Sequence, residues 1–151
     1  MENKQLNIKL AIACDHAGFD FKEDIKTYLE KKGYIIKDFG TYSNESTDYP
    51  DYAHPLAEAV EKGNYLFGIT LCGSGNGINM TANKHQGIRA ALCWNVEISE
   101  LARLHNNANV CSIPARFVNI DLAKKIIDIF LTTKFEGGRH LQRIEKIPVK
   151  K

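Results

Sequence analysis

The residues with the greatest chemical potential lie in one short stretch, 71–77 (LCGSGNG). It follows an apolar run at 65–70 that is typical of a buried strand, and it precedes 78–84, which is long enough for a short helix. A strand that turns through glycines into a helix directs unpaired backbone N–H groups at whatever lies above the turn. Such a turn favours a thiolate, so Cys72 is a candidate base or nucleophile beside an anion site.

Other interpretations of this stretch remain open. Its glycine spacing, G-x-G-x-G, matches neither the G-x-G-x-x-G of dinucleotide-binding turns nor the phosphate loop G-x-x-x-x-G-K-[ST]. The turn could therefore be purely structural and Cys72 an inert buried thiol, although Ser74 beside it favours a small anionic ligand. The sequence does not separate a base from a covalent nucleophile. A redox role has the least support, because no resolving cysteine lies nearby in sequence.

Two polar pairs at the ends of predicted elements are further candidates. Asp15 and His16 follow an apolar run, where Asp15 could equally be the N-cap of the next helix. His105 and Asn106 end a predicted helix and could simply form its C-terminus. His105, however, continues the apolar face of that helix, so we expect it to point inward or towards a partner.

Basic residues near the C-terminal end suggest a phosphate site. Arg139 and Arg143 are four residues apart and share a face if this segment is helical. Exposed arginines are usually just solvated, but a paired basic face with His140 beside it also suits a phosphate. The segment 136–144 is too polar for us to expect it in the core.

Strand-like and helix-like segments alternate along the chain. Apolar runs predict strands at 9–14, 34–39, 65–70, 88–93 and 109–113, with four or five helices between and after them, one over roughly 52–61 with Pro55 in its first turn. This alternation is typical of an α/β sandwich with a parallel sheet. Ligands of such sheets bind beyond the carboxyl ends of the strands. We therefore expect Asp15, His16, residues 72–77 and Arg116 to share one rim.

The composition is that of an ordinary globular protein. With 44% hydrophobic and 25% charged residues in 151, we expect one folded domain over 1–151. The net charge of +2, from 20 basic and 18 acidic residues, argues against a nucleic-acid or membrane-binding surface. No apolar run approaches the ~20 residues that span a bilayer, and the polar start shows no secretory signal.

The cysteines indicate a reducing compartment. None of the four forms a C-x-x-C pair or a zinc spacing, and three lie in or at the end of apolar strand-like runs. Such cysteines are usually small buried hydrophobes, so we expect a cytoplasmic protein without a metal. The four are Cys14, Cys72, Cys93 and Cys111.

Several short segments, in one order, carry a resemblance to a known family. They are 14–18 (CDHAG), 47–50 (TDYP), 71–75 (LCGSG), 77–78, 82–84 (ANK), 87–90 (GIRA), 105–106 (HN), 136–140 (EGGRH) and Arg143. Together they resemble the type B ribose-5-phosphate isomerase family, whose relatives include galactose-6-phosphate and allose-6-phosphate isomerases. The resemblance implies a three-layer, Rossmann-like α/β/α sandwich with a five-stranded parallel sheet. It also implies aldose–ketose isomerisation without a metal or organic cofactor.

The resemblance further implies a homodimer whose active sites are built from both chains, with the C-terminal segment 134–151 packing on the partner. Whether dimers pair into tetramers stays open. By this likeness Cys72 is the base that moves a proton between C2 and C1, and Ser74 assists transfer between the oxygens. The likeness also implies that the N–H groups of Gly73, Gly75, Asn76 and Gly77 stabilise the enediolate and that Asp15 binds substrate hydroxyls. It implies that His105, positioned by Asn106, opens the sugar ring and that Tyr49 lines the sugar pocket. The implied phosphate ligands are His16, Arg116, Arg139 and Arg143.

The resemblance also bears on substrate choice. The galactose-6-phosphate enzymes lack the cysteine found here at position 72, so its presence favours interconversion of ribose 5-phosphate and ribulose 5-phosphate. Two alternatives remain: an isomerase of a six-carbon aldose phosphate, and a non-catalytic module that binds phosphosugars.

Overall fold

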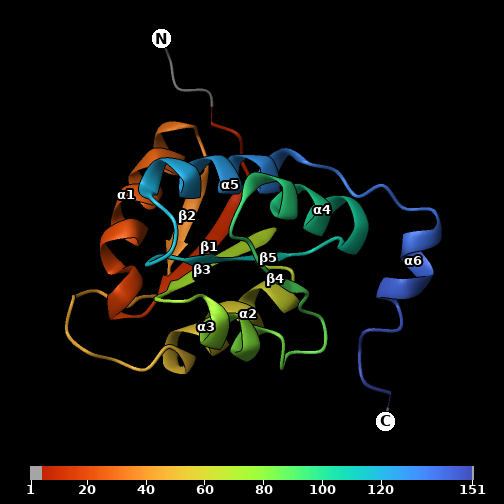
Figure 1. Ribbon diagram of the computed structural model, residues 1–151, viewed down its shortest axis with the longest axis horizontal. Helices are drawn as coiled ribbons and strands as arrows, with labels where there is room; N and C mark the ends of the chain where they lie inside the picture. The colour runs from red at the N-terminus through yellow and green to blue at the C-terminus, as the bar shows by residue number, and fades with distance from the viewer. Residues whose placement is uncertain (1–4, 151) are drawn as a thin grey trace.

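A five-stranded, all-parallel sheet forms the centre of the molecule, in the order β2-β1-β3-β5-β4 (Figure 1). The computed structural model describes residues 5–150. The strands are β1 (Lys9–Cys14), β2 (Ile35–Asp38), β3 (Phe67–Cys72), β4 (Ala90–Leu92) and β5 (Val110–Pro114). The predicted α/β/α sandwich with a five-stranded parallel sheet is therefore confirmed.

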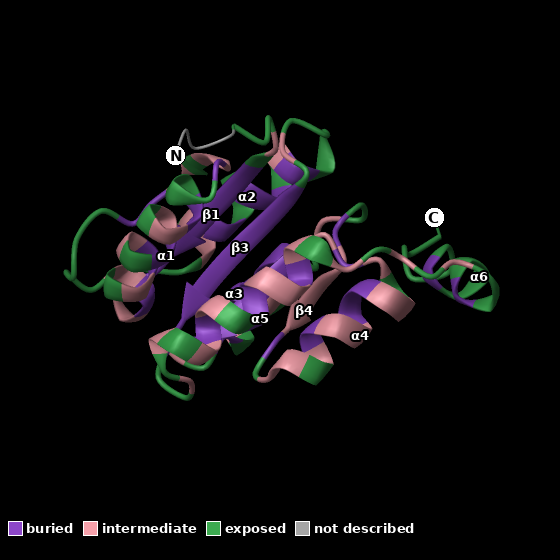
Figure 2. Ribbon diagram, turned by 90° about the horizontal axis from the view of Figure 1, so that it is seen from above, coloured by how far each residue is buried: buried purple, intermediate pink, exposed green. Residues whose placement is uncertain are grey.

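Helices cover both faces of the sheet (Figure 1). One layer holds α1 (Phe19–Lys31), α4 (Val96–Asn106) and α5 (Ile120–Thr132), and the other holds α2 (Pro50–Glu61) and α3 (Asn76–Ala82). A short 3₁₀ turn, η1 (His16–Gly18), follows β1, and α6 (Arg139–Ile144) lies near the C-terminal end. Figure 2 shows that the sheet strands β1 and β3 are buried, while exposed residues lie on the outer sides of the helices.

The alternation of side chains along β1 builds both halves of the core. Leu10 and Ile12 pack in the larger apolar cluster with α1, α4 and α5, whereas Ala11 and Ala13 pack in the smaller cluster with α2 and α3. Successive side chains of a strand point to opposite faces, so a strand covered on both sides is apolar throughout. This explains why the central strands are continuous apolar runs in the sequence.

Two predictions from the sequence are wrong. The helix expected over 52–61 begins at Pro50, so Pro55 lies inside it and not in its first turn. Proline is well suited to the first helical position, where its missing N–H is not needed. The segment expected to be too polar for the core forms α6, in which His140 and Ile144 are buried. A helix can bury one side while the rest of its surface stays polar.

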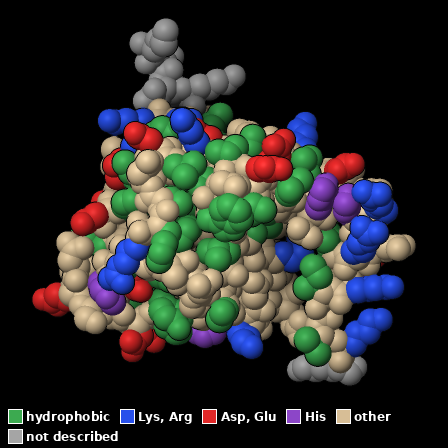
Figure 3. All heavy atoms as spheres, viewed as in Figure 1, with side chains coloured by type: hydrophobic (Ala, Val, Ile, Leu, Met, Phe, Trp, Pro, Cys, Tyr) green, Lys and Arg blue, Asp and Glu red, His purple; other side chains and the backbone are tan. Residues whose placement is uncertain are grey.

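Helix α6 packs against α4 and stands apart from the two layers (Figures 1 and 2). Histidine and basic side chains gather on this side of the molecule (Figure 3). Within residues 5–150, we find no helix that combines the length and the apolar character needed to cross a bilayer.

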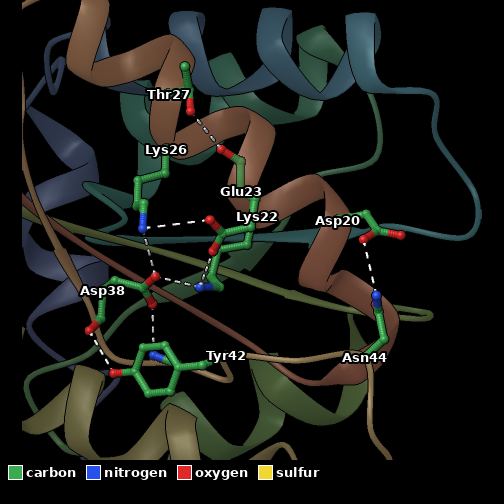
Figure 4. A network of polar contacts seen from close by, with 9 residues as sticks. Asp20, Lys22, Glu23, Lys26, Thr27, Asp38, Tyr42 and Asn44 are labelled. Atoms are coloured by element: carbon green, nitrogen blue, oxygen red, sulfur yellow. Dashed lines mark hydrogen bonds and ion pairs between the residues drawn. The ribbon is translucent and has the colours of Figure 1, made fainter.

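A buried ion pair joins α1 to the end of β2 (Figure 4). The ammonium of Lys22, which is fully buried, donates to Asp38 at 2.5 Å and to Glu23 at 2.9 Å. Lys26 reaches the same Asp38 carboxylate at 3.2 Å. Burial acts to raise the pKa of Asp38, but hydrogen bonds from Lys22 and the Gly40 N–H, with the Lys22 charge, hold it below its usual value.

We expect Asp38→Asn to lower the free energy of unfolding by about 3 kcal/mol at pH 7, because Lys22 stays buried and keeps only Glu23 as a counter-charge. A carboxyl whose pKa is lowered by folding stabilises the folded protein at pH values above its unfolded-state pKa of about 3.9. This stabilisation is lost as the pH falls through the folded-state pKa. The difference between variant and wild type should therefore shrink in acid. Urea unfolding of variant and wild type at pH 7 and in acid measures this difference in the free energy of unfolding. Glu58→Gln, in the exposed Glu58–Lys62 pair, is the control and should change nothing measurable.

Candidate active site

The loops after β1, β3 and β5 meet at the carboxyl edge of the sheet. The Asp15 N–H donates to the Leu71 carbonyl at 3.2 Å, and the N–H groups of Ala115 and Arg116 donate to the carbonyls of Cys72 and Gly73, each at 3.0 Å. In the sheet, β2 lies on one side of β1, and β3, β5 and β4 lie on its other side. The strand order therefore reverses between β1 and β3. Ligands of open α/β sheets bind at such a point.

A cavity of about 440 Å³ opens at this edge. Its lining residues are Asp15, Tyr49, Cys72, Gly73, Ser74, Gly77, Arg116 and Phe117. A neighbouring cavity of about 490 Å³ is lined by His16, Thr47 and other loop residues, and it shares Asp15 and Tyr49 with the first. The prediction that the residues after strands one, three and five share a rim is therefore confirmed.

The glycine turn lines this cavity through Gly73, Ser74 and Gly77. Gly75 has φ of +76°, and a Cβ built there would lie 2.5 Å from Leu92 Cδ1 and 3.1 Å from the Pro114 nitrogen, so only glycine fits. Among the described residues, the N–H groups of Gly73, Ser74 and Gly75 have no protein acceptor. The N–H of Asn76, predicted to face the ligand, instead donates to Ser74 Oγ at 3.2 Å.

Cys72 lies at the end of β3, 4% exposed, packed with Ala53 and Ile78 and lining the cavity. The other three cysteines lie in the larger core cluster between the sheet and α1, α4 and α5. Burial raises the pKa of the Cys14 thiol to about 12 and also raises that of Cys111. Of the four, Cys72 is the thiol placed to meet a ligand.

Asp15 and His16 connect the rim to the loop before α2. The Asp15 carboxylate is buried and accepts from the N–H groups of Ala17 at 2.9 Å and Gly18 at 3.3 Å, so it is indeed an N-cap while also lining the cavity. His16 Nδ1 accepts the Thr47 N–H at 3.2 Å. An accepting Nδ1 leaves the proton of a neutral imidazole on Nε2. The Asp15 carboxylate thus both caps η1 and lines the cavity, while His16 connects η1 to the loop before α2.

The side chains of Tyr49 and Arg116 lie against the glycine turn. A Cβ built at Gly77 would lie 2.4 Å from Tyr49 Cζ, and one built at Gly73 would lie 3.1 Å from Arg116 Nη1. Both glycines therefore allow the close approach of a side chain that lines the cavity. Within the described chain Arg116 forms no ion pair, so its guanidinium can receive an anion. Phe117 also lines the cavity and is 76% exposed. It was not predicted from the sequence, although an aromatic residue directly after Arg116 was a usable signal.

The remaining predicted site residues lie elsewhere in this chain. Helix α4, which carries His105 and Asn106, leads into the amino end of β5, at the edge of the sheet opposite the cavity. Arg139 and Arg143 belong to α6, which packs on α4. Within one chain, these four residues therefore do not join Cys72.

His105 is held at a well-defined helix end. Asn107 ends α4 with φ of +45°, and the Arg89 guanidinium donates to the carbonyls of Asn106 and Asn107 at 2.9–3.1 Å. Of the two directions predicted for His105, the inward one is wrong, because its side chain is 39% exposed. Its ring stacks on His140 of α6 with centroids 4.3 Å apart. The helix-terminus interpretation is confirmed.

The comparisons with known proteins agree with this architecture. The sequence profile of the Ribose/Galactose Isomerase family matches residues 10–147. Ribose-5-phosphate isomerase B of Escherichia coli is 46% identical over 139 residues, which is 92% of this chain and 93% of that protein. The chain therefore belongs to the ribose/galactose isomerase family.

Two solved structures are close to this one. The ribose 5-phosphate isomerase of Thermotoga maritima has a TM-score of 0.92 and 50% identity, covering 94% of this chain and 98% of that one. Ribose-5-phosphate isomerase B of Mycoplasma genitalium, solved with bound ribulose-5-phosphate, has a TM-score of 0.90 and 41% identity, with 95% of each chain covered.

Proposed function

We propose that this protein interconverts D-ribose 5-phosphate and D-ribulose 5-phosphate through an enediolate, with Cys72 as the base. Its family and its similarity to the ribose-5-phosphate isomerases of Escherichia coli and Mycoplasma genitalium support the reaction. The observation that carries the mechanism is the position of Cys72, at the end of β3, lining the cavity beside three free backbone N–H groups.

The chemistry follows from this arrangement. The Cys72 thiolate removes the proton on C2 of the open-chain aldose, and the electron pair moves into an enediolate. The N–H groups of residues 73–75 stabilise the oxyanion, and they are held in place by the turn before the charge develops. The Ser74 hydroxyl carries the proton from O2 to O1, and the thiol returns the C2 proton to C1. No step requires a metal or an organic cofactor.

A second copy of the chain completes the site in this proposal. The cavity of one chain holds Cys72 and Arg116, while His105, Asn106 and the α6 arginines lie at the opposite edge of the sheet. In a homodimer the partner presents these residues to the cavity, where His105 opens the furanose ring and Arg139 and Arg143, with His16 and Arg116, hold the phosphate. The single domain 1–151 then includes a C-terminal segment, 134–151, that packs on the partner.

The proposed location is the cytoplasm. All four cysteines are free thiols, and each is buried. Free thiols persist in compartments that are kept reducing.

The direct test compares kcat/KM for ribose 5-phosphate with that for allose 6-phosphate and galactose 6-phosphate. We expect ribose 5-phosphate to be the preferred substrate. The family also includes galactose isomerases by its name, so a preference for a hexose phosphate would instead identify a six-carbon isomerase. Binding of sugar phosphates without turnover would identify a non-catalytic binding module.

We expect Cys72→Ala to lower kcat about 10²-fold or more while changing KM little, because it removes the base and not the phosphate ligands. Steady-state kinetics with ribose 5-phosphate measures this. Cys93→Ala is the matched control, since Cys93 lies in the larger core cluster away from the cavity, and it should keep kcat. Unchanged turnover in Cys72→Ala would remove the assigned base.

A shared site predicts recovery of activity when two inactive variants are mixed. We expect Cys72→Ala and His105→Asn to be inactive alone; refolded together, half of the dimers are hybrids with one intact site, giving about a quarter of the wild-type activity. The control pairs Cys72→Ala with Ser74→Ala, both from the same rim, and its hybrids contain no intact site. If the first mixture is no more active than the second, the site lies within one chain.

A further inference from the structure

Three side chains of types that can ligate a metal meet on the α6 side of the molecule, away from the cavity of the same chain. His105 comes from the last turn of α4, Glu136 from the segment before α6, and His140 from α6 itself. The Nε2 atoms of His105 and His140 lie 3.7 Å and 3.8 Å from the same oxygen, Oε2 of Glu136. One donor atom from each residue fits within 4.8 Å of the other two.

We propose that His105, Glu136 and His140 bind one divalent transition-metal ion, with Zn²⁺ as the best match, and leave a fourth position open to water. Two imidazoles and one carboxylate are a ligand set that zinc uses when one coordination position stays free. Imidazole nitrogen also discriminates against Mg²⁺ and Ca²⁺, which take oxygen ligands. The proposed ligand is therefore zinc or a metal of similar preference.

The distances between donor atoms suit a single ion. Donors of a tetrahedral zinc site lie about 3.3–3.5 Å apart, given zinc–nitrogen and zinc–oxygen bonds of about 2.0–2.2 Å. Both distances to Glu136 are only a few tenths of an ångström longer than this. The Glu136 N–H donates to the Leu104 carbonyl at 3.1 Å, which anchors the backbone of Glu136 next to the last turn of α4.

One adjustment is required. The two imidazole rings stack with an angle of 12° between their planes, and a metal must lie in the plane of each ring that binds it. His140 is buried, but the His105 side chain is 39% exposed at the end of its helix, so its ring can turn out of the stack. Buried His140 is thus the fixed ligand of the site, and the more exposed His105 and Glu136 side chains adjust to the ion.

The charged groups around these three side chains affect how tightly they can bind a cation. Burial and the charge of His105 lower the pKa of His140; Glu136 opposes this, and Arg139 and Arg143 add to it. The same two arginines repel a cation, so we expect weaker binding than in a structural zinc site.

The other histidine pair provides a matched control. His54 Nδ1 and His85 Nε2 are 2.9 Å apart and hydrogen-bonded to each other, so they share a proton and do not aim two lone pairs at one ion. Glu61 lies near the opposite nitrogen of His85, at 3.4 Å from Nδ1. This second cluster has the same residue types but the wrong arrangement.

Zinc at this site would occupy the imidazole that opens the sugar ring. Zinc is therefore expected to inhibit the isomerisation of ring-closed substrate. The inhibition, unlike the binding, rests on the proposed function of His105.

The experiment titrates chelator-treated full-length protein with Co²⁺ and follows the visible d–d absorption of the bound ion, then displaces Co²⁺ with Zn²⁺. We expect one ion per chain in wild type. Glu136→Gln and His140→Asn should each weaken binding about tenfold or more, since even outer ligands change metal affinity by that factor. His54→Asn should leave the affinity unchanged. Circular dichroism checks folding, and exposed Glu136 makes Glu136→Gln the safer variant.

Three outcomes would overturn the proposal: no Co²⁺ or Zn²⁺ binding to wild type, loss of binding in His54→Asn but not in Glu136→Gln, or thiolate-to-cobalt absorption in the near ultraviolet, which would locate the ion at a cysteine. None of them depends on turnover, so a failure of the proposed function is detected separately. With binding established, zinc inhibition of wild type that is weaker in Glu136→Gln would extend the result to catalysis.

Discussion

The parallel pairing of β3 with both β1 and β5 is the constraint on which the site depends. Three neighbouring strands that run in one direction release their following loops at one edge of the sheet. The register pairs Cys14 with Leu71 and Cys72 with Pro114, so the strands also end at nearly the same level. A shift of one residue would turn the Cys72 side chain to the other face of the sheet. Burial on both faces therefore fixes where the sulfur points.

Hydrogen bonds among side chains of β3, β5 and α3 tie the helix after the glycine turn to the sheet. The hydroxyls of Thr70 in β3 and Ser112 in β5, both fully buried, lie 2.8 Å apart, and Asn79 of α3 donates to Ser112 Oγ at 3.0 Å. Asn83, just after α3, donates to Asn79 at 3.2 Å and also pairs with the backbone of Ala90 in β4. Connected hydrogen bonds of this kind favour one arrangement of the elements that they join. They link three strands to the helix that follows the turn.

The sequence predicts the sheet and the rim well, because both depend on local patterns. Continuous apolar runs mark strands covered on both faces, and the polar residues that follow them must lie at the carboxyl edge. Helix boundaries are harder, because the polar first turn of α2 carries no apolar periodicity before Tyr52. The burial of Ile144 could not be predicted, since it depends on contacts with α4 that are distant in sequence. For the same reason, the sequence could not place His105 beside His140.

The division of the predicted site between two edges of the sheet gives the account its central claim, which is that one chain supplies the base and another supplies the phosphate ligands of α6. A crystal structure of the protein with ribose 5-phosphate tests it most directly. The account predicts C1 and C2 of the sugar next to the Cys72 sulfur, with the phosphate held by Arg139 and Arg143 of a second copy. A sugar phosphate enclosed by one chain alone, or bound with its C2 far from that sulfur, would contradict it.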